Sequence, residues 1–139
     1  MVALDALGGA PMKVTSIPGK GRGLVANRSL REGQTLEWSP VIAFPAEERP
    51  DLDQTALFPY YFVRQTDYRD KPERAEGLIV LGLMTLCNHA DEPNAAVDWL
   101  EEPEGPAARL VALREINQGE EITLRYANID AYQGAATFI

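Results

Sequence analysis

The sequence predicts a mainly β domain built from short strands. Short alternating or apolar runs recur at intervals of roughly ten residues and are separated by turns that contain glycine or proline. No long amphipathic helix can be traced along the chain. The 139 residues, of which 45% are hydrophobic, suffice for one globular domain with one core.

The first half of the chain is expected to contain four of these strands. Residues 1–11 are small and punctuated by glycine and proline, which predicts an N-terminal arm. Residues 18–23 predict a tight glycine-rich turn, Pro40 is expected to interrupt a strand, and the acidic, proline-rich residues 45–57 predict a surface connection. Alternating or apolar runs predict strands at 12–17, 24–26, 34–38 and 41–44.

The second half continues the pattern. The aromatic residues 57–63 predict a strand, the charged residues 65–76 a loop, and the apolar residues 77–86 a buried strand that passes into a helical turn. An acidic hairpin loop at 101–106 and a turn at 117–120 separate further strands expected at 95–100, 109–112 and 121–126. We therefore expect one domain over residues 12–127 and a tail over 128–139.

Composition narrows the class of partner and compartment. The formal net charge of −8 and the pI of about 4.6 argue against direct nucleic-acid binding, and they suit a basic partner such as a lysine-rich protein tail, although ordinary solubility gives the same balance. The single cysteine, Cys87, excludes an intrachain disulfide and a cysteine-rich zinc cluster and fits a reducing compartment. The N-terminus has no basic signal-peptide region, and no apolar run approaches the ~18–20 residues of a membrane span. We expect a cytoplasmic protein, or a nuclear one in a eukaryote.

The only histidine, His89, directly follows Asn88 and the apolar run. Pro93-Asn94 come next and are typical of a turn. A polar pair that emerges from a buried segment needs hydrogen-bond partners, either inside the protein or from a ligand. Taken alone, the pair fits a satisfied core histidine beside a turn better than a ligand site.

Three motifs together carry a resemblance to a known family. They are Lys20-Gly21-Arg22-Gly23-Leu24, then Asn88-His89 with Pro93-Asn94, then Gly119-Glu120-Glu121-Ile122-Thr123-Leu124-Arg125-Tyr126. The first motif lacks the last glycine of the dinucleotide-binding fingerprint. In this order and at these separations the motifs resemble the SET domain of protein lysine methyltransferases, over about residues 12–127.

The resemblance implies a β-clip-like fold of short curved sheets with a pseudoknot and little helix. The pseudoknot would bring Asn88, His89 and Tyr126 together. Residues 20–23 would lie against S-adenosylmethionine, with glycines that allow close approach of the backbone. Asn88 would bind the amino-acid end of this cofactor, and the backbone at His89 its adenine.

The resemblance also implies the reaction, which is transfer of a methyl group to the side-chain amine of lysine. The lysine would enter from the opposite face through a narrow channel, and the hydroxyl of Tyr126 would orient its amine. Tyr60 and Tyr61 either line this channel or belong to the core. Neither a metal ion nor a protein nucleophile is needed, so Cys87 is expected to serve packing.

Some positions bear on the details of the reaction. Val97, or Trp99 if the alignment shifts, matches the position at which an aromatic residue often narrows the channel, and valine there predicts a di- or trimethylated product. The chain has Ala90-Asp91 after the Asn-His pair and Arg125 before the final tyrosine, where many relatives have Ser-Cys and Asp. No cysteine-rich zinc segment follows, so either the tail, with Tyr132 and Phe138, or a second subunit is expected to close the cofactor site.

Two alternatives remain open at this point. One is a catalytically weak or inactive SET-like module that binds a basic peptide or the cofactor without turnover. The other is an unrelated small β-barrel in which the motifs coincide by chance. Intact Asn88 and Tyr126 favour the enzyme.

Overall fold

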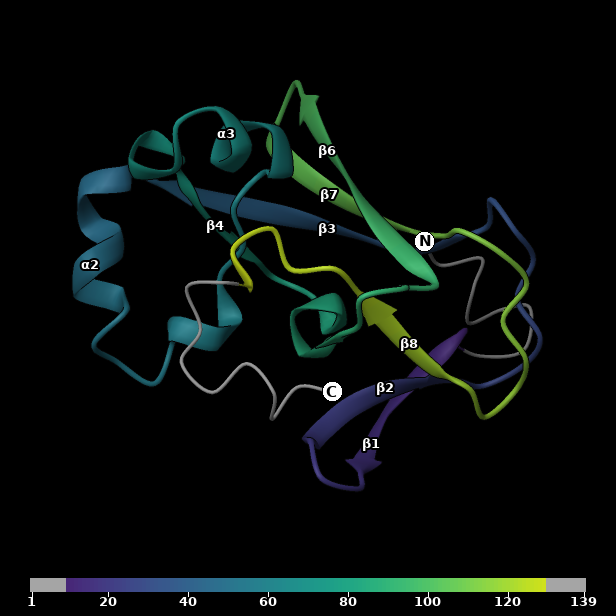
Figure 1. The fold of residues 1–139 in the computed structure, drawn as a ribbon. Helices are drawn as coiled ribbons and strands as arrows, with labels where there is room; N and C mark the ends of the chain where they lie inside the picture. The colour runs from purple at the N-terminus through teal and green to yellow at the C-terminus, as the bar shows by residue number, and fades with distance from the viewer. Residues whose placement is uncertain (1–9, 130–139) are drawn as a thin grey trace.

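The structure, a computed structural model, describes residues 10–129, which fold into two four-stranded sheets flanked by short helices (Figure 1). The expected arm (1–11) and tail (128–139), including Tyr132 and Phe138, therefore lie almost wholly outside the described residues. The strands are β1 (Met12–Ile17), β2 (Gly21–Ala26), β3 (Thr35–Phe44), β4 (Gly77–Val80), β5 (Asn88–His89), β6 (Ala95–Glu102), β7 (Gly105–Ala112) and β8 (Glu121–Leu124). The helices are α2 (Arg49–Leu52) and α3 (Gln65–Asp70), with 3-10 turns η1 (Ala46–Glu48), η2 (Phe58–Tyr60), η3 (Pro72–Arg74) and η4 (Leu83–Leu86).

The mainly β class is confirmed, and so are most of the expected strands. One sheet has the order β1-β2-β8-β5 and the other the order β4-β3-β7-β6. β6 and β7 form the expected hairpin, paired from Ala95↔Ala112 to Glu102↔Gly105. Gly105 adopts a φ of 128°, which residues other than glycine rarely adopt. The strand that passes into a helical turn is present as β4 followed by η4.

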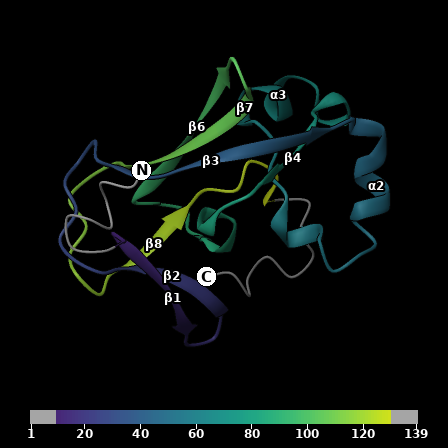
Figure 2. The ribbon, with the colours of Figure 1, turned by 180° about the vertical axis from the view of Figure 1, so that it is seen from behind.

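Pro40 does not interrupt its strand, contrary to the prediction. β3 is one long strand that changes partner at Pro40, pairing with β7 up to this residue and with β4 beyond it (Figure 2). The Pro40 carbonyl accepts a hydrogen bond from the N–H of Leu81 at 3.0 Å. The missing N–H of proline is tolerated where a strand exchanges neighbours.

Three other segments differ from the sequence prediction. Residues 57–63 are a 3-10 turn followed by a single bridge, Phe62↔Leu78, because Pro59 fixes φ inside the aromatic run. The charged segment 65–76 contains α3 and η3 instead of an open loop. The glycine-rich turn ends at residue 20, and Gly21 already begins β2.

The main core lies between the two sheets, and its largest fully buried side chains include Leu24, Leu78, Met84, Leu110 and Ile122. A second, smaller cluster lies beneath α2 and α3 and contains Phe44 and Tyr61. No helix within residues 10–129 is long and apolar enough to cross a membrane.

Candidate active site

The Asn-His segment lies beside the last strand. β5 pairs with β8 in parallel, with Asn88 opposite Thr123 and His89 opposite Leu124. The N–H of Ala90 extends this pairing by donating to the Leu124 carbonyl at 2.8 Å. The crossing that the resemblance implied is therefore present, and it brings Tyr126 next to His89, with ring centroids 5.3 Å apart.

Tyr126 is held at its backbone and at its hydroxyl group. Its backbone N–H donates to Nδ1 of His89 at 3.0 Å, across a separation of 37 positions in sequence. Its hydroxyl donates to the carbonyl of Cys87 at 2.7 Å. Since both partners belong to the segment that enters β5, the position of the phenol is set by the crossing itself.

Asn94 also holds β8 in place, through hydrogen bonds from its side-chain amide to the backbone of this strand. Its Oδ1 accepts the N–H of Thr123 at 2.9 Å, and its Nδ2 donates to the carbonyl of Glu121 at 2.8 Å. The side chain thus replaces a neighbouring strand for part of β8. The sequence placed Asn94 in a turn and in the second motif, but neither shows which backbone groups its side chain satisfies.

Asn88 connects β5 to β2 and β8. Its Nδ2 donates to the Arg22 carbonyl at 3.1 Å and to Oε2 of Glu121 at 2.8 Å, and Lys20 pairs with Oε1 of the same carboxylate at 3.2 Å. A Cβ on Gly23 would lie only 2.7 Å from Nδ2 of Asn88. Gly23 is thus needed for the approach of Asn88, whereas the resemblance implied a direct approach of its backbone to the cofactor.

Two cavities meet at Tyr126. The first, of about 230 Å³, is lined by backbone and side chains of residues 20–22 and by Asn88, and the second, of about 250 Å³, by mostly apolar side chains. Pro59, Thr85 and Tyr126 line both cavities. A group in one cavity can therefore face a group in the other across the tyrosine.

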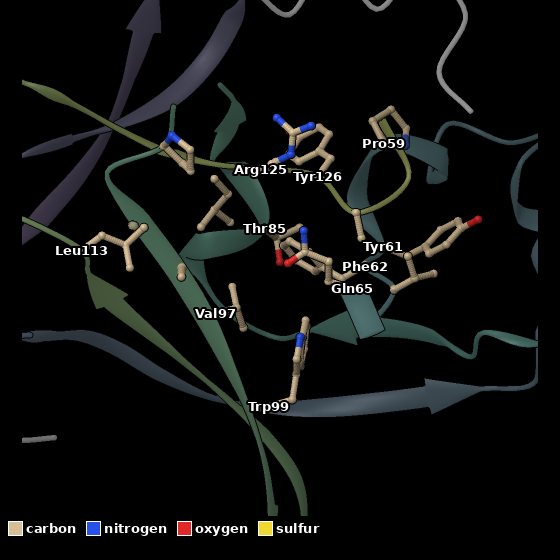
Figure 3. A pocket seen from close by; sticks show the side chains of 16 residues that line it. Pro59, Tyr61, Phe62, Gln65, Thr85, Val97, Trp99, Leu113, Arg125 and Tyr126 are labelled. Atoms are coloured by element: carbon tan, nitrogen blue, oxygen red, sulfur yellow. The ribbon is translucent and has the colours of Figure 1, made fainter. Parts of the chain in front are cut away.

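Aromatic and aliphatic side chains form the wall of the second cavity (Figure 3). Val97 and Trp99 project from β6, and Trp99 packs against Phe62 with ring centroids 5.7 Å apart. The hydroxyl of Tyr61 points away from this cavity and donates to Asp53 at 2.6 Å. Tyr60 lines the first cavity instead of the second.

Of the residues predicted to contact a cofactor, Lys20, Gly21, Arg22 and Asn88 line the first cavity. Gly23 and His89 are not among its lining residues. Cys87 contributes its carbonyl to the site, while burial raises the pKa of its thiol. A buried, protonated thiol fits the packing role expected from the sequence.

Glu37 is a site residue that sequence reasoning missed. Its two carboxylate oxygens accept the N–H groups of Leu83 and Met84, both at 2.8 Å, at the start of η4. This anchoring positions η4, where Thr85 lines both cavities, and the following Cys87, which lines the first. A charged residue inside the alternating run 34–38 was the available indication, but alternation does not reveal the partner.

Comparisons with known proteins identify the family of the chain. The family model of the SET domain matches residues 21–127. The histone-lysine N-methyltransferase of Schizosaccharomyces pombe that is specific for H3 lysine-37 is 31% identical over 120 residues, which cover 86% of this chain and 75% of that protein.

Two solved structures share the fold. A candidate histone methyltransferase from Plasmodium falciparum superposes with a TM-score of 0.64 at 21% identity, covering 84% of this chain and 92% of that chain. A humanized mutant of the Chaetomium thermophilum Polycomb Repressive Complex 2, bound to the inhibitor GSK126, superposes with a TM-score of 0.62 at 16% identity, covering 90% of this chain and 15% of that chain. With the family match over most of its length, the chain belongs to the SET-domain family.

Proposed function

We propose that the chain transfers a methyl group from S-adenosylmethionine to the side-chain amine of lysine in a basic protein. The observation that supports this most strongly is the pair of cavities that share Tyr126, since an in-line displacement needs donor and acceptor on opposite sides. The family and the S. pombe relative support lysine methylation as the class of activity. The net charge of −8 favours a basic protein over an acidic one.

The residues of the first cavity fit the amino-acid end of S-adenosylmethionine. Lys20 and Arg22 supply positive charge for a carboxylate. Both donor hydrogens of the Asn88 amide are engaged by Arg22 and Glu121, which leaves Oδ1 to accept from an ammonium group. A Cβ on Gly21 would meet no atom within 4 Å, so its backbone borders open space. When bound, the cofactor supplies an electrophilic methyl group.

The second cavity suits a neutral lysine side chain. The ammonium form, with an unperturbed pKa of about 10.4, cannot attack, and an apolar wall disfavours the charged form. The Tyr126 hydroxyl donates to the carbonyl of Cys87, and a phenol oxygen can also accept from an amine N–H or from a polarised C–H group. Tyr126 would thus orient the amine toward the junction with the first cavity.

We expect S-adenosylmethionine to raise the melting temperature of the protein, and a chelator not to abolish the effect. A ligand at 100 times its Kd adds roughly 2.7 kcal/mol to the free energy of unfolding. Differential scanning fluorimetry with and without EDTA measures the shift. No shift at millimolar cofactor, or a shift that EDTA removes, would contradict the proposed cofactor site.

The reaction itself is tested by incubating the protein with methyl-labelled cofactor and basic proteins, including histones, followed by mass spectrometry of lysine-containing peptides. Methyl-lysine that depends on the cofactor would support the proposed function. A cofactor-dependent thermal shift without any methylated peptide would instead identify a binding module that does not turn over.

Val97 bears on how many methyl groups are added. It lines the second cavity and carries neither a ring nor a hydroxyl, so space remains for an amine that already holds a methyl group. We expect di- or trimethylated product from the wild type and a shift toward monomethyl-lysine in Val97→Tyr. The product distribution at long reaction times measures this, and a wild type that stalls at monomethyl-lysine with cofactor in excess would contradict the expectation.

A further inference from the structure

Asp91 and Arg125, two positions at which the chain departs from many relatives, contact one another beside Tyr126. Nη1 of Arg125 lies 3.4 Å from Oδ1 of Asp91. The same Oδ1 lies 3.0 Å from Nε2 of His89. A surface ion pair alone contributes little to stability. This ion pair matters because Arg125 helps to orient the carboxylate of Asp91. The same carboxylate contacts His89, the only histidine in the chain.

The contacts of His89 determine which nitrogen of its ring carries the proton. A backbone N–H can only donate, so Nδ1, which lies 3.0 Å from the N–H of Tyr126, must carry a lone pair. The proton of the neutral ring is therefore on Nε2, where Asp91 is positioned to accept it. His89 is only 3% exposed, so loss of this acceptor would leave a buried N–H without its partner or make the ring turn.

We propose that Asp91 is a positioning residue, which accepts the Nε2–H of His89 and thereby holds Nδ1 against the backbone N–H of Tyr126. The chain of contacts runs from Arg125 through Asp91 and His89 to Tyr126, which lines both cavities. Asp91 is 75% exposed and lines neither cavity, so it acts through His89 and touches no reacting group. Its effect on turnover rests on the proposed function, whereas its effect on His89 does not.

The first test is NMR of the full chain labelled with ¹⁵N, after removal of any histidine tag. Because the chain holds one histidine, the ring signals are unambiguous. In the wild type we expect the tautomer with its proton on Nε2. In Asp91→Ala we expect exchange of this proton to be about tenfold faster, and the Tyr126 amide signal to shift.

Two further variants serve as controls. Asp91→Asn keeps an acceptor oxygen for His89. Glu92→Ala removes a neighbouring exposed carboxylate that takes no part in the chain of contacts from Arg125 to Tyr126. We expect both to retain the ring signals and the Tyr126 amide signal of the wild type. The proposal is overturned if Asp91→Ala resembles Glu92→Ala, or if Asp91→Asn is as perturbed as Asp91→Ala.

The second test compares kcat with KM. Loss of one positioning hydrogen bond predicts a kcat about three- to tenfold lower in Asp91→Ala, with recovery to within about twofold in Asp91→Asn. Any long-range effect of charge on KM should also occur in Glu92→Ala, but the effect on kcat should not. Equal kcat in Asp91→Ala and Glu92→Ala would overturn the link to turnover. If the wild type shows no methyl transfer, the proposed function fails, and the NMR spectra still decide the role of Asp91.

Discussion

Tyr126→Phe is expected to lower the rate of methyl transfer by about two to three orders of magnitude, the scale seen when one preorganised hydrogen-bonding group is removed from a transition state. The substitution removes the hydroxyl that donates to the Cys87 carbonyl at 2.7 Å, from a residue that lines both cavities. The ring and the backbone contact with His89 should remain, because phenylalanine preserves both. Affinity for S-adenosylmethionine should therefore change much less than the rate.

Single-turnover rates at saturating cofactor measure the chemical step, and calorimetric titration measures the affinity. Tyr68→Phe is the matched control, because it also removes one tyrosine hydroxyl, but on α3 and from a residue that lines neither cavity. Turnover of Tyr126→Phe near that of the wild type would exclude Tyr126 from the mechanism. Loss of folded protein, seen as a collapsed melting transition, would show instead that the hydroxyl is needed for structure.

Local sequence patterns were sufficient to predict most of the strands. The β6–β7 hairpin followed from alternation around an acidic turn, and the approach of His89 to Tyr126 was implied by the resemblance to the SET domain. Pro40 was misjudged because its cost depends on whether its missing N–H would have had a partner. The run 57–63 was misjudged because aromatic residues favour strands and also pack well on 3-10 turns, as Phe58 of η2 does against Tyr61.

The partners of individual polar side chains could not be predicted in the same way. Glu37, Asn94 and Glu121 each lie in a segment whose secondary structure was largely anticipated. Their hydrogen bonds nevertheless connect positions 26 to 101 apart in sequence, which only the folded topology defines. Periodicity identifies the face on which a residue lies, whereas satisfaction of buried polar groups is a property of the whole fold.

Asn94→Ala tests the most buried of these contacts. We expect it to lower the free energy of unfolding by about 3–5 kcal/mol, because it leaves two buried backbone groups unsatisfied and each such group costs about 1–3 kcal/mol. Asn94 is 3% exposed, and its amide satisfies the N–H of Thr123 and the carbonyl of Glu121 in β8. Alanine is too small to bring any other polar atom to these groups. The loss would be a large share of the roughly 5–15 kcal/mol that stabilises a typical domain.

Urea denaturation followed by tryptophan fluorescence measures the free energy of unfolding. Asn117→Ala, which changes an asparagine on an exposed turn, is the matched control and should change this free energy by no more than about 0.5 kcal/mol.

Asn94→Asp keeps the acceptor for the N–H of Thr123. It turns a carboxylate oxygen toward the Glu121 carbonyl and toward Glu120, whose Oε2 lies 3.5 Å from Nδ2 of Asn94. It should therefore also be destabilised, and more so at neutral than at acidic pH, where the new carboxyl can be protonated and donate. An Asn94→Ala protein within about 1 kcal/mol of the wild type would mean that water replaces the amide and that Asn94 does not hold β8 in place.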